Sequence, residues 1–204
     1  MNPAALKANV GDVPRGGLLL IDTDEFTRRN LAKVGYPASP LDDGSLASYH
    51  VHGVGLTSIT VQALAGCDLT RKEKERAKNM FALGLLSWLY DRPTEGTEAF
   101  LRRKFGRKPE ILKANLVALQ AGWNYGETTE DFAVRYSVAP APMAAGTYRN
   151  ITGNVALAYG LVVGAHRSGH PLVLGSYPIT PASDILHTLA GLKRFGVTTL
   201  QAED

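Results

Sequence analysis

The chain has 204 residues, and its 22 basic and 19 acidic side chains give a net charge of +3 at pH 7. This charge is too small to indicate nucleic-acid binding, and no run approaches the ~18 consecutive apolar residues of a membrane-spanning helix. A single cysteine, Cys67, excludes a disulfide framework and an iron–sulfur cluster held by this chain alone, because a cluster needs several thiolates. We therefore expect a globular protein of the reducing cytoplasm.

The first quarter of the chain predicts two strands and two helices. Asn2 and Pro3 begin a short helix over 4–10. Residues 18–22 form a continuous apolar run that ends in an acid, as buried parallel strands often do. Thr23 or Asp24 can begin a helix that reaches about residue 33, and residues 49–54 alternate as a second strand does.

The middle of the chain is mostly helical in pattern. Thr70 and Glu73 have the spacing of a capping box, which begins a helix expected over 71–90. Residues 61–64 are apolar and fit either a strand or a helix. Further elements are expected before residue 139: helices over 94–105 and 109–121, a polar loop over 122–129 and a strand over 132–138.

Residues 139–146, Ala-Pro-Ala-Pro-Met-Ala-Ala-Gly, have the composition of a linker. The sequence therefore predicts two domains, 1–138 and 148–204, joined by 139–147. The second begins with a helix over 154–167. On this helix Ala156, Gly160 and Gly164 form a small-residue stripe, which favours close packing against a neighbouring element.

The last stretch predicts a strand, a rigid loop, a helix and a second strand, so a parallel pair is expected. Pro178 and Pro181 stiffen the loop after the strand over 171–174. Thr180 has the position of an N-cap, with Pro181 at the first helical position. A loop of this kind presents backbone donors and a hydroxyl where α/β sheets bind ligands, and an anionic group suits it. The same pattern also fits an ordinary capped loop.

Three motifs in the second half of the chain resemble those of a known enzyme family. Gly153-Asn154, Tyr177-Pro178-Ile179-Thr180-Pro181 and the closing Gln-Ala-Glu-Asp of residues 201–204 resemble the thiamine diphosphate-dependent 2-oxoacid:ferredoxin oxidoreductases. The greatest resemblance is to the large subunit of 2-oxoglutarate:ferredoxin oxidoreductase. In that subunit a gamma domain precedes a pyrimidine-binding alpha domain. The resemblance implies an α/β fold with part of a gamma-type domain over 1–138 and the first strand–helix units of the alpha domain over 148–204.

The resemblance also implies an activity. The complete enzyme would decarboxylate a 2-oxoacid oxidatively, with 2-oxoglutarate as first candidate, form an acyl-coenzyme A and reduce ferredoxin. Thiamine diphosphate would be the cofactor, and magnesium and the iron–sulfur cluster would belong to a partner beta subunit. Thr180 would donate to the substrate carboxylate, Tyr177 and Ile179 would adjoin the substrate, and Pro178 would lie against the cofactor. No catalytic residue and no metal ligand is expected in this chain.

Two observations predict an internal piece of a larger subunit that is inactive alone. The last predicted strand has no helix after it to cover it. By the resemblance, the thiamine-activating glutamate of the family would directly follow residue 204, and the sequence does not include that position. The alternative is a non-catalytic module that binds coenzyme A or assembles subunits. Arg102, Arg103 and Lys104 suit phosphates for that role, although a solvated helix face is the simpler explanation for them.

Overall fold

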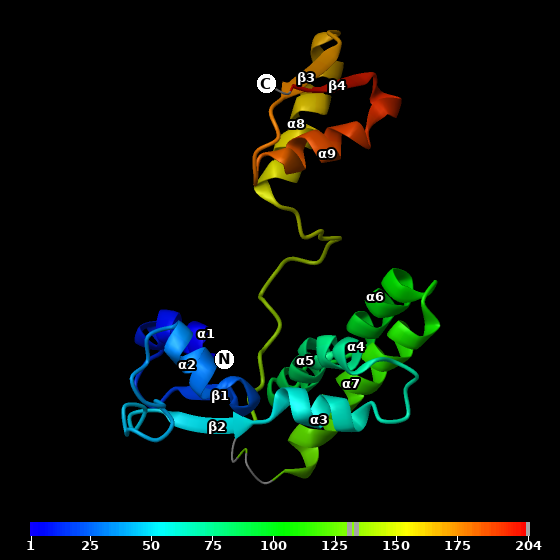
Figure 1. The fold of residues 1–204 in the computed structure, drawn as a ribbon. Helices are drawn as coiled ribbons and strands as arrows, with labels where there is room; N and C mark the ends of the chain where they lie inside the picture. The colour runs from blue at the N-terminus through cyan, green and yellow to red at the C-terminus, as the bar shows by residue number, and fades with distance from the viewer. Residues whose placement is uncertain (130–131, 133–134, 203–204) are drawn as a thin grey trace. The chain divides into compact units, whose positions relative to one another are not determined.

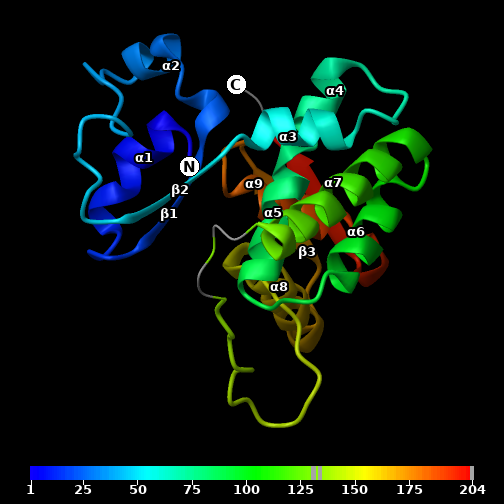
Figure 2. The ribbon, with the colours of Figure 1, turned by 90° about the horizontal axis from the view of Figure 1, so that it is seen from below.

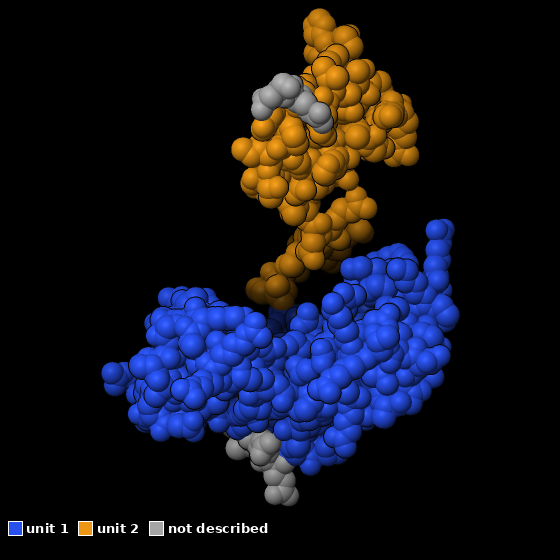
Figure 3. Space-filling model, viewed as in Figure 1, with its two compact units in different colours: residues 1–140 blue, residues 141–204 orange. Residues whose placement is uncertain are grey.

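The computed structural model describes residues 1–129, 132 and 135–202 (Figure 1). The chain divides into two compact units, Met1–Pro140 (unit 1) and Ala141–Asp204 (unit 2), coloured separately in Figure 3. The division falls within the stretch 139–147 that the sequence marks as a linker. Each unit contains a two-stranded sheet and helices, so the α/β class expected from the sequence is confirmed.

The sheet of unit 1 joins β1 (Leu18–Asp22) to β2 (His50–Val54) in parallel register. Leu19 and Ile21 are fully buried in a small core with Leu6 of α1 (Pro3–Asn9). The prediction of a single helix after β1 is wrong. A 3-10 turn, η2 (Thr23–Glu25), comes first, and α2 (Arg28–Lys33) begins after Thr27, whose side chain accepts a hydrogen bond from the Asn30 amide.

Five helices follow among the described residues of unit 1: α3 (Leu56–Ala63), α4 (Arg71–Arg76), α5 (Lys78–Leu89), α6 (Glu95–Phe105) and α7 (Pro109–Thr128). The capping box is confirmed, since Thr70 and Glu73 bond reciprocally. The helix expected over 71–90 is two helices that meet at Ala77. The polar loop expected from Gly122 is wrong, because α7 continues through it.

Helices α5 and α7 lie side by side with their backbones in contact (Figures 1 and 2). A Cβ atom on Gly84 would lie 1.9 Å from the Leu119 carbonyl oxygen, and one on Gly122 would lie 1.9 Å from the Phe81 carbonyl oxygen. A Cβ on Gly126 would overlap the Trp88 ring. These glycines therefore allow a helix–helix contact that no larger residue permits.

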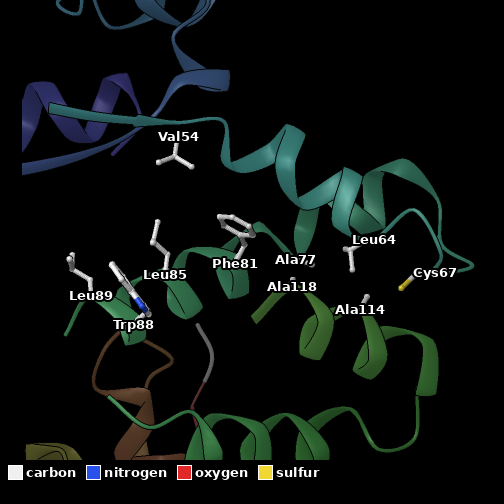
Figure 4. Close-up of a cluster of buried hydrophobic side chains, with 10 residues drawn as sticks. All are labelled: Val54, Leu64, Cys67, Ala77, Phe81, Leu85, Trp88, Leu89, Ala114 and Ala118. Carbon is white, nitrogen blue, oxygen red and sulfur yellow. The ribbon is translucent and has the colours of Figure 1, made fainter. Parts of the chain in front are cut away.

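The main core of unit 1 lies on α5 (Figure 4). Phe81 and Leu85 are fully buried, and so is Leu64, the residue that directly follows α3. The strand expected over 132–138 falls partly on residues 133 and 134, which lie outside the described residues. The described part is not a strand. It packs on the end of α5, where the Tyr136 amide donates to the Leu89 carbonyl at 2.7 Å.

Unit 2 consists of α8 (Gly153–Ser168), β3 (Leu172–Ser176), α9 (Ser183–Ala190), the 3-10 turn η3 (Lys193–Phe195) and β4 (Val197–Gln201). Strands β3 and β4 are parallel, as expected. One sheet face packs on the helices around Ala158 and Leu189. The other face exposes Val173 (65%) and Leu200 (63%).

The small-residue stripe of α8 is expected to pack closely against a neighbouring element, but no described residue packs against it at Gly160 or Gly164. A Cβ atom on Gly160 or Gly164 would meet nothing within 4 Å. Within the part of the chain that the structure describes, no helix is both long and apolar enough to cross a membrane.

Candidate functional site

The loop between β3 and α9, residues 177–182, leaves the carboxyl end of a parallel strand and is tied at both sides. The Ile179 carbonyl accepts from the Ser183 amide at 2.9 Å and from the Ser183 hydroxyl at 3.1 Å. The Pro181 carbonyl accepts from the Asn154 side-chain amide at 3.0 Å. The loop is thus held to the first turn of α9 and to the start of α8. The Thr180–Pro181 peptide bond is cis.

The expectation that Thr180 caps the following helix is wrong. Helix α9 begins at Ser183, its N-cap residue is Ala182, and no side chain caps it. The Ile179 carbonyl is bonded to Ser183, so the chain makes a turn over 180–182 before the helix starts. As a result the Thr180 hydroxyl makes no hydrogen bond to any residue that the structure describes, and it is available to a ligand.

The four residues predicted at the substrate and cofactor lie together on this loop and are all exposed: Tyr177, Pro178, Ile179 and Thr180. The loop segment 177–181 contains no charged side chain, so an anionic group next to Thr180 would meet no repulsion from this segment. Asn154 is the residue whose contact sequence reasoning missed. It stands in a motif, but no local pattern relates it to a carbonyl 27 positions away.

The basic residues on the last turn of α6 do not form an enclosed site by themselves. Arg102 lies 3.7 Å from Glu98, one turn back; the Arg102 side chain is exposed and the Glu98 side chain is partly exposed. Arg103 and Lys104 lie over the Phe100 ring, at 5.7 and 5.3 Å from its centroid. Contacts of this kind are typical of a solvated helix face.

An ionic cluster closes the carboxyl end of the sheet in unit 1. The Lys78 ammonium lies 2.6 Å from Glu25, 3.5 Å from Asp22 and 3.2 Å from the Thr57 hydroxyl. Asp22 also accepts from the Leu56 amide at 3.2 Å, so its carboxylate caps the start of α3. Because this helix start is filled by a carboxylate of the chain, it offers no room to a bound anion.

In this cluster, burial and the neighbouring charges shift the pKa values of Asp22 and Lys78 in opposite directions. Burial raises the pKa of Asp22, and the nearby Lys78 charge lowers it. Burial alone would lower the pKa of Lys78, but the hydrogen bond to Glu25 and the charge of Asp22 raise it above its ordinary value. Among the described residues no group of three His, Cys, Asp or Glu side chains is arranged to hold a metal ion.

The comparisons with known proteins identify the family. Residues 1–125 match the family model described as pyruvate ferredoxin/flavodoxin oxidoreductase. The chain belongs to this family. Its sequence is 59% identical over all 204 residues to the 2-oxoglutarate oxidoreductase subunit KorA of Mycobacterium tuberculosis, of which it covers 31%. It is 29% identical over 164 residues, or 76% of the chain, to subunit alpha of 2-oxoacid:ferredoxin oxidoreductase 1 of Aeropyrum pernix, of which it covers 24%.

A solved structure of this oxidoreductase family has the same fold. It is the 2-oxoglutarate:ferredoxin oxidoreductase from Magnetococcus marinus, described with 2-oxoglutarate, coenzyme A and succinyl-CoA bound. The TM-score is 0.71 at 25% identity, over the whole of our chain and 31% of that one. The chain thus spans about a third or less of the length of these relatives. The family resemblance that the sequence motifs indicate is confirmed.

Proposed function

We propose that this chain forms part of a 2-oxoacid:ferredoxin oxidoreductase that acts on 2-oxoglutarate. The reaction joins the substrate and coenzyme A into succinyl-CoA, releases carbon dioxide and passes two electrons to ferredoxin. The observation that carries the proposal is the 59% identity, over every residue of the chain, to a 2-oxoglutarate oxidoreductase subunit. On this proposal unit 1 is a gamma-type domain and unit 2 is the start of a pyrimidine-binding domain.

The loop over 177–182 fits the substrate and the cofactor in its chemistry. The Thr180 hydroxyl would donate to a substrate carboxylate, and the exposed side chains of Tyr177 and Ile179 would adjoin the carbon chain of the 2-oxoacid. Pro178 offers an apolar surface to thiamine diphosphate, which would supply the carbanion chemistry when bound. Asn154 keeps the Pro181 carbonyl in place, so it fixes the loop next to Thr180.

The proposal assigns magnesium and the iron–sulfur cluster to a partner beta subunit. A cluster needs several thiolates, and this chain has one cysteine, Cys67, which is buried. Ferredoxin would accept electrons from that partner.

Replacing Thr180 with alanine in the complete complex should lower kcat/KM for 2-oxoglutarate by at least about tenfold, because a hydrogen bond to a charged group is typically worth about 1.5–3 kcal/mol. The measurement is 2-oxoacid-dependent reduction of viologen at varied substrate. Thr180→Ser keeps the hydroxyl and serves as the control, with most of the activity retained. Alanine kinetics equal to wild type would remove Thr180 from the substrate site.

A second candidate is a non-catalytic module that binds coenzyme A or assembles subunits. The outward face of the β3–β4 sheet favours assembly, because parallel sheets are normally covered on both faces and Val173 and Leu200 are exposed here. In this candidate Arg102, Arg103 and Lys104 would attract the phosphates of coenzyme A. The Thr180 experiment separates the two candidates, since only the first requires that hydroxyl for turnover.

A further inference from the structure

A groove with a volume of about 470 Å³ lies in unit 2, and residues of α8 and of the 3-10 turn η3 line it; we call it the α8–η3 groove. Its volume falls in the range of about 300–1,000 Å³ that is usual for small-molecule sites. The residues that α8 contributes recur at the spacing of one turn, so they share one face of the helix: Tyr159, Val162, Val163 and His166.

Most of the side chains that line the α8–η3 groove are apolar. Val162 and Leu192 are partly buried, and both also pack against the core of unit 2. Val163 is 56% exposed and Phe195 is 52% exposed, although both are large and apolar. A ligand with an apolar body would remove these side chains from water, and the release of that water would favour its binding.

Two arginines from different segments bring positive charge to the same groove. Arg149 comes from the segment before α8, and Arg194 comes from η3. Neither forms an ion pair with an acid among the residues that the structure describes. The Arg194 guanidinium lies 4.9 Å from the centroid of the Phe195 ring, so a charge and an apolar surface adjoin there. A guanidinium group has the planar geometry that pairs with a carboxylate, and the His166 imidazole can donate a further hydrogen bond.

The charged side chains at the groove all have one sign. Within the described part of the chain no acidic side chain lines it, so the lining favours an anion over a metal ion or an amine. We propose that the α8–η3 groove binds a small carboxylate whose body is an aromatic ring or a branched alkyl chain. Arg149 and Arg194 pair with the carboxylate, and the body covers Val163 and Phe195. No residue of the loop over 177–182 lines the groove, so it is a site separate from the candidate substrate site.

The test is an NMR titration of the whole chain with 3-phenylpropionate, followed through the methyl signals of valine and leucine. The signals of Val162, Val163 and Leu192 should shift with a Kd on the order of 1 mM, as the small size of this probe allows. Two probes separate its parts: 3-phenylpropionamide keeps the shape without the charge, and acetate keeps the charge without the ring. Each should bind at least about tenfold more weakly. The signals of Val173 and Leu200, which are exposed on the sheet of the same unit, should not move.

Arg149→Gln combined with Arg194→Gln should weaken binding of 3-phenylpropionate at least about tenfold. The matched control is Arg167→Gln combined with Lys193→Gln, which removes the same charge from exposed positions on α8 and η3 outside the groove. It should change the affinity less than about twofold.

Thermal melting of each variant checks that it folds. If the double variant of Arg149 and Arg194 does not fold, Arg194→Gln alone should still weaken binding about threefold. Equal weakening by the two pairs of substitutions overturns the proposal. So do equal binding of the amide, shifts confined to Val173 and Leu200, and no binding at tens of millimolar probe. None of these results touches the proposed function, which depends on the Thr180 kinetics.

Discussion

Replacing Gly84 with alanine is expected to destabilise unit 1 by about 3 kcal/mol, at the upper end of what overpacking usually costs. The new Cβ atom would lie 1.9 Å from the Leu119 carbonyl oxygen of α7, and a backbone atom cannot swing aside as a side chain can. Helices α5 and α7 would have to separate, and the core on α5 would separate with them. The thermal midpoint should fall on the order of 10 °C.

The matched control is Gly96→Ala on α6. Gly96 is also a helical glycine of unit 1, but a Cβ atom there would meet nothing within 4 Å. This substitution should leave the melting temperature unchanged or raise it slightly, because alanine favours the helix. Gly122→Ala should repeat the Gly84 result from the other helix. A Gly84→Ala protein that melts within about 2 °C of wild type would show that the two backbones do not touch.

The same contact explains why the sequence predicts a loop where α7 continues. Gly122, Gly126 and the polar residues around them resemble a loop when taken alone, so α7 is predicted to end too early. They are helical because the glycines face α5, where Phe81 and Trp88 leave room for nothing larger. The side of a helix that needs glycine is known only once its neighbour is known.

Local signals succeeded where the cause is local. The apolar runs over 18–22 and 171–174 identified strands, and the bond between Thr70 and Glu73 spans three residues. The sequence does not reveal the break at Ala77 within the helix expected over 71–90, because residues that favour a helix lie on both sides of it.

In the candidate site, sequence placed Tyr177, Pro178, Ile179 and Thr180 on a loop at a strand end, and the structure has them there. It gave Thr180 the wrong local role, because the choice between a cap and a turn depends on which donor takes the Ile179 carbonyl. It could not find the bond from Asn154 or the cluster around Lys78, since both join segments far apart in the chain.

Replacing Lys78 with methionine should destabilise unit 1 by about 2 kcal/mol. Asp22 is only 5% exposed and would lose its nearest cation, which for fully buried pairs costs about 3–5 kcal/mol. The value expected here is smaller because the Lys78 side chain is 29% exposed and solvent screens the pair. Urea unfolding at neutral pH measures the loss. Lys72→Met is the control, because Lys72 is exposed on α4 and forms no ion pair within the described part of the chain.

The loss at Lys78 should depend on pH in a defined direction. Burial raises the pKa of Asp22, so the folded chain holds this proton more tightly than the unfolded chain. Stability therefore falls as the pH rises through that raised pKa. Lys78 opposes the shift, so without it the pKa of Asp22 rises further and the penalty at neutral pH grows.

Below that pKa the Asp22 carboxyl is neutral in both proteins. The difference in unfolding free energy between wild type and Lys78→Met should therefore shrink as the pH falls toward about 4. Asp22→Asn should remove most of this pH dependence, because the amide keeps an acceptor for the Leu56 amide and carries no charge. Adding it to Lys78→Met should restore part of the lost stability, with a coupling of about 1 kcal/mol. A deficit that stays constant with pH would mean that Lys78 stabilises the fold through its packing or its bond to Glu25, and not through Asp22.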